Sequence, residues 1–119
     1  MQIEVKGIYC LELCEPDSPA DPTCCAVLMS ADIGLVGTTG ADRFRFHVVT
    51  PEFLAQNPEV RWGHGYLLMP EFSWTEVNRM LARIISRASA ENWDAAAQKL
   101  CRYLEWEFDD YQQSAKTDG

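Results

Sequence analysis

A strand passes directly into a helix in the sequence Phe44-Arg45-Phe46-His47-Val48-Val49-Thr50-Pro51. Apolar residues alternate with Arg45 and His47, and this period of two is typical of a strand with one buried face. Thr50 has the side chain of a helix N-cap, and proline is favoured at the first helical position, which Pro51 would occupy. The sequence therefore predicts a strand that is followed at once by a short helix.

Two more strands are predicted before this stretch and one after it. Residues 3–13 alternate well enough for a strand with a bulge at Gly7, and residues 24–33 form a second strand. A turn rich in glycine and threonine follows over residues 34–40, and residues 66–69 form a short apolar fourth strand. Because successive strands with short connections pair as hairpins, an antiparallel meander is expected.

Two helices are predicted in the last third of the chain. Ser73 and Glu76 have the spacing of a capping box, and Phe72 and Val77 have that of a hydrophobic staple. Asn92 is placed to cap the last helix. Strands followed by helices in blocks indicate the α+β class. The predicted fold is an antiparallel sheet of about four strands with two long C-terminal helices packed on one face.

Length and composition indicate one domain. The chain has 119 residues, of which 47% are hydrophobic, and residues 1–111 are expected to form the domain. Residues 112–119 have nothing to bury and are expected to be a disordered tail. The N-terminus has no basic region leading into an apolar run, and no apolar stretch approaches membrane-spanning length. A cytoplasmic location and no membrane partner are predicted.

The charge excludes one class of partner and favours another. The formal net charge is −8. Residues 1–42 hold seven acidic residues and one basic residue, residues 43–104 hold six and eight, and residues 105–119 hold five and one. Nucleic-acid binding needs a basic face, so no nucleic-acid partner is expected. A basic partner protein fits the charge better.

The cysteines do not indicate a metal site. Neighbours such as Cys24 and Cys25 point to opposite faces of a strand, and no pair has the spacing of a zinc knuckle. We expect reduced thiols, no metal, no cofactor and no catalytic residue. A small cysteine-dependent enzyme, with His47 or His64 as base, remains an alternative because such pairs need not be close in sequence.

The closing stretch Trp106-Glu107-Phe108-Asp109-Asp110-Tyr111 interleaves aromatic side chains with carboxylates, which is typical of a binding surface. If the last helix continues through it, Trp106 points away from the apolar face and is a candidate anchor. If the helix ends near Glu105, Trp106 folds back into the core. The predicted partner-binding residues are Glu105, Trp106, Asp109 and Asp110, with Glu15 and Asp17 of the proline-rich loop and Trp62.

Three segments resemble the immunity protein 8 family, whose members accompany bacterial polymorphic toxins. They are residues 46–54, residues 63–68 and residues 93–111, ending in the closing stretch. The resemblance covers roughly the last two thirds of the chain.

This resemblance implies a cytoplasmic antidote that binds and neutralises a cognate toxin domain, and it supplies no catalytic residues. The expected toxin domain is basic, since an acidic inhibitor would be steered to it. An adaptor or regulatory domain unrelated to toxins is the remaining alternative.

Overall fold

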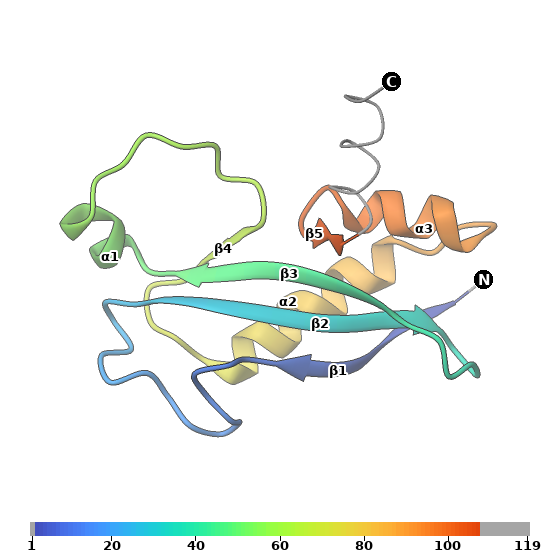
Figure 1. Ribbon diagram of the computed structural model, residues 1–119, viewed down its shortest axis with the longest axis horizontal. Helices are drawn as coiled ribbons and strands as arrows, with labels where there is room; N and C mark the ends of the chain where they lie inside the picture. Colours follow the sequence, from blue (N-terminus) through green and yellow to red (C-terminus); the bar gives the residue numbers. More distant parts are fainter. Residues whose placement is uncertain (1, 108–119) are drawn as a thin grey trace.

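The structure is a computed structural model that describes residues 2–107. Within these residues, five strands form one sheet, and three helices accompany it (Figure 1). The strands are β1 (Ile3–Tyr9), β2 (Ala26–Leu35), β3 (Asp42–Val49), β4 (Tyr66–Leu68) and β5 (Glu105–Trp106). The helices are α1 (Pro51–Gln56), α2 (Trp74–Arg87) and α3 (Trp93–Leu100).

β3 is the centre of the sheet. β1, β2 and β3 pair as an antiparallel meander, as predicted. The outer edge of β3 is shared by two short strands: β4 runs parallel to residues 47–49, and β5 runs antiparallel to residues 44–45. The expectation that every strand is antiparallel is wrong for β4. The connection from β3 to β4 contains α1 and a loop, so it is long enough to return the chain for parallel pairing.

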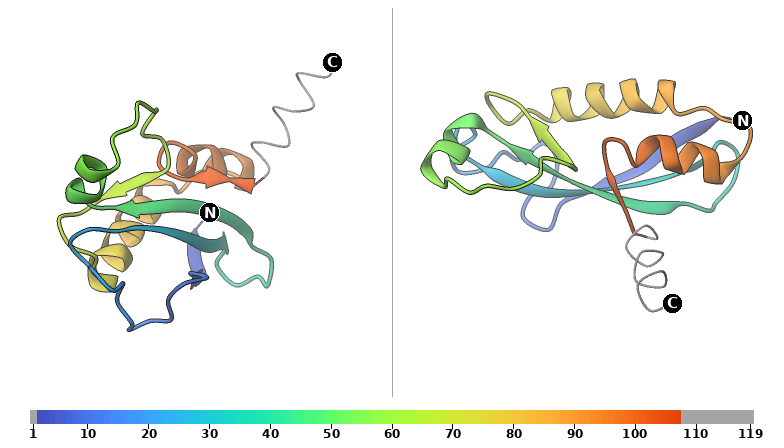
Figure 2. Two further views of the ribbon diagram at one scale, coloured as in Figure 1. Left: turned by 60° about the vertical axis from the view of Figure 1, so that its left-hand side comes forward. Right: turned by 90° about the horizontal axis from the view of Figure 1, so that it is seen from above.

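Both α2 and α3 cover one face of the sheet (Figure 2), as expected. Alternate side chains of β2 and β3 enter the core on that face, where they meet the buried residues of the helices. The predicted length of the last helix is wrong. α3 has 8 residues and ends at Leu100, where the amide of Cys101 donates to the carbonyl oxygen of Ala97.

The predicted helix caps are confirmed. The amide of Glu76 donates to Ser73 Oγ over 3.3 Å, and the amide of Ala95 donates to Asn92 Oδ1 over 2.9 Å. Thr50 Oγ1 accepts from the amide of Phe53 at the start of α1 and from the amide of Cys25 beside β2. Because Thr50 is fully buried, these hydrogen bonds fix α1 against the beginning of β2.

The opposite face of the sheet is not covered by α2 or α3 (Figure 2). The register aligns Leu28, His47 and Tyr66 in one row across it. A second row contains Ser30, Arg45 and Glu105. We call this surface the open face.

The predicted bulge in β1 is confirmed by a register shift between Val5 and Gly7. The Tyr9 ring lies back over Gly7, and a side chain at residue 7 would meet its hydroxyl group at 2.4 Å. The Arg43 guanidinium lies 5.3 Å from the centre of the same ring and pairs with Asp32 at 3.0 Å. The side chains of Tyr9, Arg43 and Asp32 therefore lie together on the open face, near β1.

Candidate partner-binding surface

Trp106 is buried. The helix that begins at Trp93 ends at Leu100 and does not continue into the closing stretch. The prediction that Trp106 points outward is therefore wrong, and the alternative that it folds back into the core is confirmed. Its side chain is 7% exposed. The chain turns after α3, where the amides of Tyr103 and Leu104 both donate to the carbonyl oxygen of Leu100. Trp106 then pairs with Phe44 in β5, on the core side of the sheet.

Two aromatic contacts and a carboxylate hold Trp106 in place. Its indole stacks on the Phe44 ring with 6.1 Å between centroids and 12° between planes. Trp93 approaches the same Phe44 ring edge-on at 6.3 Å. Asp42 accepts hydrogen bonds from both indoles. Trp106 therefore joins α3 to the sheet, and it is not an outward anchor.

Glu105 lies on the other side of the same short strand, beside the loop that precedes β4. Gly65 has a positive φ of 78°, and a Cβ on it would approach Glu105 Cγ at 3.0 Å. Glycine has no Cβ, so it can adopt the positive φ and leaves room for the side chain of Glu105. The fold thus brings Glu105 to the end of the loop that carries Trp62. Asp109 and Asp110 lie outside the described residues, as do Phe108 and Tyr111.

Trp62 lies on the loop 57–65, which we call the Trp62 loop. Its side chain is 93% exposed. The loop is nevertheless attached to its surroundings at two positions. Arg61 donates to the Tyr66 hydroxyl group and pairs with Glu59, and His64 Nε2 lies 2.6 Å from the carbonyl oxygen of Cys101. An exposed indole on an anchored loop is a feature of protein-binding surfaces.

Apolar side chains surround a hollow next to the Trp62 loop. The hollow has a volume of about 490 Å³ and lies between α1, the loop and β4. We call it the α1–β4 hollow. Leu68 is 59% exposed there, Leu54 is 37% exposed, and Val60 is fully exposed. The sequence analysis missed these residues because isolated apolar residues in short elements show no periodicity.

Glu15 and Asp17 lie on the exposed loop between β1 and β2, as predicted. The loop contacts the beginning of α2. The Trp74 indole donates to the carbonyl oxygen of Asp17 over 2.6 Å, and the amide of Phe72 donates to the carbonyl oxygen of Pro22 over 2.7 Å. The loop that carries both carboxylates therefore lies against the N-terminus of α2, at the left-hand end of the sheet in Figure 1.

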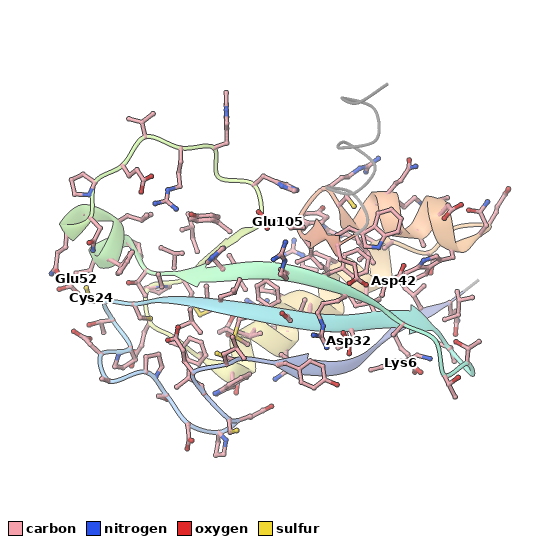
Figure 3. All side chains as sticks on the ribbon, in the orientation of Figure 1. Lys6, Cys24, Asp32, Asp42, Glu52 and Glu105 are labelled. Atoms are coloured by element: carbon pink, nitrogen blue, oxygen red, sulfur yellow. The ribbon has the colours of Figure 1, made fainter. Side chains whose placement is uncertain are left out.

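The fold gathers acidic side chains at that end of the sheet. The segments 10–25, 50–61 and 69–73 all lie there (Figure 1). Cys24 and Glu52 lie together at this end, whereas Lys6 and Asp42 lie toward the other (Figure 3). We call these segments the acidic end; their charged residues are seven carboxylates and one base, namely Glu12, Glu15, Asp17, Asp21, Glu52, Glu59, Glu71 and Arg61.

The thiols of Cys24 and Cys25 are not activated by their surroundings. Burial, followed by the charges of Glu52 and Asp21, raises the pKa of Cys24. Burial also raises the pKa of Cys25, with smaller effects from Asp21 and Cys24. A nucleophilic cysteine needs the opposite shift. In the described part of the chain, no three His, Cys, Asp or Glu residues could hold a metal ion.

The comparison with protein families identifies the chain. The model of immunity protein 8 matches residues 3–111, which is nearly the whole length. The chain belongs to the immunity protein 8 family. The resemblance of the three segments is confirmed, and the match also includes β1 and β2. No curated protein and no solved structure matches the chain.

Family membership gives the general role. An immunity protein 8 chain is an immunity protein directed against a toxin, so its partner is a toxin. None of the helices in residues 2–107 has the length and apolar character needed to cross a membrane. The Trp62 loop with the α1–β4 hollow, the acidic end and the open face are among the surfaces that a partner can reach in the described part of this immunity protein.

Proposed function

We propose that this immunity protein 8 chain acts in the cytoplasm as an antidote that binds one cognate toxin domain and blocks it by direct contact. No catalytic step and no cofactor are involved. The observation that carries the proposal is the 93% exposure of Trp62 on an anchored loop, in a chain that belongs to an immunity protein family. A large indole exposed to water gains much free energy when a partner covers it.

Trp62 is the proposed anchor, and the acidic residues provide long-range attraction. Glu15 and Asp17 project from an exposed loop, where screened charges change the association rate more than the dissociation rate. We assign the same role to Glu105, Asp109 and Asp110. Trp106, which is buried, contributes by holding β5 beside the Trp62 loop.

The toxin domain is proposed to be basic. Complementary charge speeds the encounter of two proteins and excludes partners of like charge. The chain is not expected to compete with the toxin by binding a nucleic acid itself, because its acidic surface would repel the phosphate groups. The antidote therefore acts on the toxin protein itself.

The thiol-enzyme alternative is disfavoured for Cys24 and Cys25. The raised pKa values of Cys24 and Cys25 keep both as thiols at neutral pH. His64 is engaged with the carbonyl oxygen of Cys101. An enzyme would lose its activity when the required cysteine is changed, whereas an antidote that acts by contact should tolerate cysteine-to-serine changes.

Co-expression tests the proposal. An antidote gene is expected to lie directly downstream of its toxin gene. The domain encoded by the gene directly upstream is therefore produced, as the candidate toxin domain, in cells with and without this chain. The expected result is that the chain restores growth, co-purifies with the toxin domain and still protects when its cysteines are replaced singly by serine. An adaptor unrelated to toxins would neither restore growth nor bind the toxin domain, and this outcome would reject the proposal.

A further inference from the structure

A pocket lies between the Trp62 loop, α2 and the turn that follows α3. Its volume is about 160 Å³. An apolar cavity of about 150 Å³ lined by Leu, Ile and Phe takes up one benzene molecule. We call this hollow the α2 pocket, and it has room for one apolar side chain. The apolar residues that line it are Phe46, Leu67, Met80, Leu81, Ile84 and Leu104.

The rim of the α2 pocket is held in place. Residues 63–65 line one side, and Arg102 and Tyr103 line the other. His64 Nε2 lies 2.6 Å from the carbonyl oxygen of Cys101, so a hydrogen bond joins the two sides. The apolar floor belongs to the buried core. The pocket therefore exists in the free protein and can receive a side chain without a rearrangement.

Arg102 carries the charge at the rim of the pocket. In the described part of the chain, no carboxylate lines the pocket and no ion pair includes Arg102. Glu105 follows three residues later, but its side chain lies against Gly65 and outside the lining. Arg102 is exposed, so water solvates its guanidinium in the free protein. Its charge is thus available to a partner.

α2 adds positive charge beside the pocket. Arg83 is exposed on α2, between the lining residues Met80 and Ile84. Residues 73–104, which include both α2 and α3, contain five basic and three acidic residues, although the whole chain has a net charge of −8. The α2 pocket therefore lies in a locally basic part of an acidic protein.

The charge of Arg102 selects the occupant. A partner that covers the pocket also removes water from this guanidinium, and a charge that loses its water without gaining a partner is costly. A lysine or arginine side chain in the pocket would place a like charge beside it. A purely apolar surface would leave it unpaired. A carboxylate can accept two parallel hydrogen bonds from it.

We propose that the α2 pocket receives one apolar side chain of the toxin domain, and that a carboxylate next to this side chain pairs with Arg102. Trp62 directly precedes Gly63, which lines the pocket, so the anchor and the pocket contact the same partner. The inference rests on the proposed function and adds a second site to it. A basic toxin domain fits, because net charge governs the encounter whereas a local pair fixes the orientation.

A second copy of the chain is a poorer occupant. It would have to insert an exposed apolar side chain that lies beside a carboxylate, as Leu11 lies beside Glu12. Two chains with a net charge of −8 repel each other, whereas a basic toxin domain is attracted.

The closing stretch of the same chain is also a poorer occupant. β5 runs along β3 from Arg45 toward Asp42, and the side chain of Glu107 accepts from the amide of Arg43. Gly65, at the rim of the pocket, instead pairs with the amide of His47. The described chain therefore ends away from the pocket.

The experiment measures binding of the candidate toxin domain, in a catalytically inactive form, to matched variants. Arg102→Gln removes the charge at the rim, and Arg102→Lys keeps it. Arg87→Gln is the control, because it removes an equal charge from an exposed side chain outside the lining. Met80→Trp fills the pocket, and Ala82→Trp is its control, because Ala82 lines a different hollow between α2 and β1. Melting temperatures verify that the variants fold.

Arg102→Gln and Met80→Trp should each weaken binding about tenfold or more. Arg102→Lys should lose less, and both controls should bind like the wild type. If Met80→Trp does not fold, Arg102→Gln decides, because its side chain is exposed. The exposed Asp and Glu residues of the toxin domain are also changed singly to amides. One of these changes should weaken binding to the wild type and have no further effect on binding to Arg102→Gln.

Several results would overturn the inference. If the wild type binds and the pocket variants match their controls, the pocket is not a contact site and the proposed function stands. If the wild type does not bind, both proposals fail. Tighter binding by Arg102→Gln would indicate a cationic occupant, and tighter binding by Phe108→Ala would indicate that the closing stretch occupies the pocket. A dimer of the free chain that Met80→Trp turns into a monomer would indicate a second copy.

Discussion

The indole Nε1 of Trp106 donates a hydrogen bond of 3.1 Å to Oδ2 of Asp42. The same oxygen accepts a second hydrogen bond, of 2.8 Å, from Nε1 of Trp93. One carboxylate at the beginning of β3 therefore holds both α3 and β5. β5 also lies next to the end of the Trp62 loop, where Glu105 is close to Gly65.

Replacing Asp42 by alanine should destabilise the fold. The buried Trp106 indole and the partly buried Trp93 indole would both lose this acceptor, and a buried donor left unsatisfied costs about 1–3 kcal/mol. Asp42→Asn is the matched control. The amide oxygen of the new side chain can still accept a hydrogen bond, so this variant should lose less stability than Asp42→Ala. Chemical denaturation gives the free energy of unfolding, and equal stability of Asp42→Ala and the wild type would show that the indoles do not depend on Asp42.

Replacing Ser73 by alanine should cost about 1 kcal/mol of stability, because it removes the hydrogen bond to the amide of Glu76. The carboxylate of Glu76 is engaged with Arg79 at 2.6 Å. Thr75→Ala, at an exposed position of the same turn, is the control. Thermal and urea denaturation measure both variants, and a Ser73→Ala protein as stable as Thr75→Ala would contradict the cap. Binding of the toxin domain should not change.

The elements of the fold were largely predictable because their signals are local. The alternation in β3, the threonine and proline at the start of α1 and the serine cap of α2 each act within a few residues, and all are observed. The direction of β4 was not predictable in this way. It depends on how the loop after α1 returns along β3, which no local pattern encodes.

The candidate surface was predictable only in part. Trp62 was singled out from its place before a glycine-containing loop, where it could be a core residue or a contact anchor, and its exposure agrees with a contact role. Helical periodicity gave the wrong direction for Trp106, because pairing with Phe44 and the acceptor Asp42 ends the helical path early. Both partners are distant in sequence. The acidic end was also hidden, since it gathers carboxylates from three separate segments.

The reactivity of Cys24 should depend on pH with a midpoint above that of a free cysteine. Its raised pKa means that the reactive thiolate forms only at higher pH. The measurement is the rate of alkylation by iodoacetamide against pH, in a background in which Cys10, Cys14, Cys25 and Cys101 are replaced by serine so that the label reports Cys24 alone. Glu52→Gln should lower the midpoint, since the charge of Glu52 contributes to the shift. A midpoint at or below that of N-acetylcysteine would contradict the assigned environment.

Neutralising Glu15 and Asp17 should slow association with the toxin domain. In the double variant Glu15→Gln with Asp17→Asn, we expect the association rate to fall roughly two- to fivefold at low salt, with little change in dissociation. Glu91→Gln with Asp94→Asn removes equal charge near the start of α3 and is the control. Stopped-flow mixing at several salt concentrations measures the effect. A change confined to the dissociation rate would show that these carboxylates contact the toxin directly.

The central claim is that Trp62 is the anchor for the toxin domain and Trp106 is a core residue. The most direct measurement compares Trp62→Ala with Trp106→Ala for melting temperature and for binding kinetics with the toxin domain. Trp62→Ala should keep the melting temperature and lose about 2 kcal/mol or more of binding free energy. Trp106→Ala should lose about 3–5 kcal/mol of stability. If Trp62→Ala binds as tightly as the wild type, the contact surface lies elsewhere and the account is wrong.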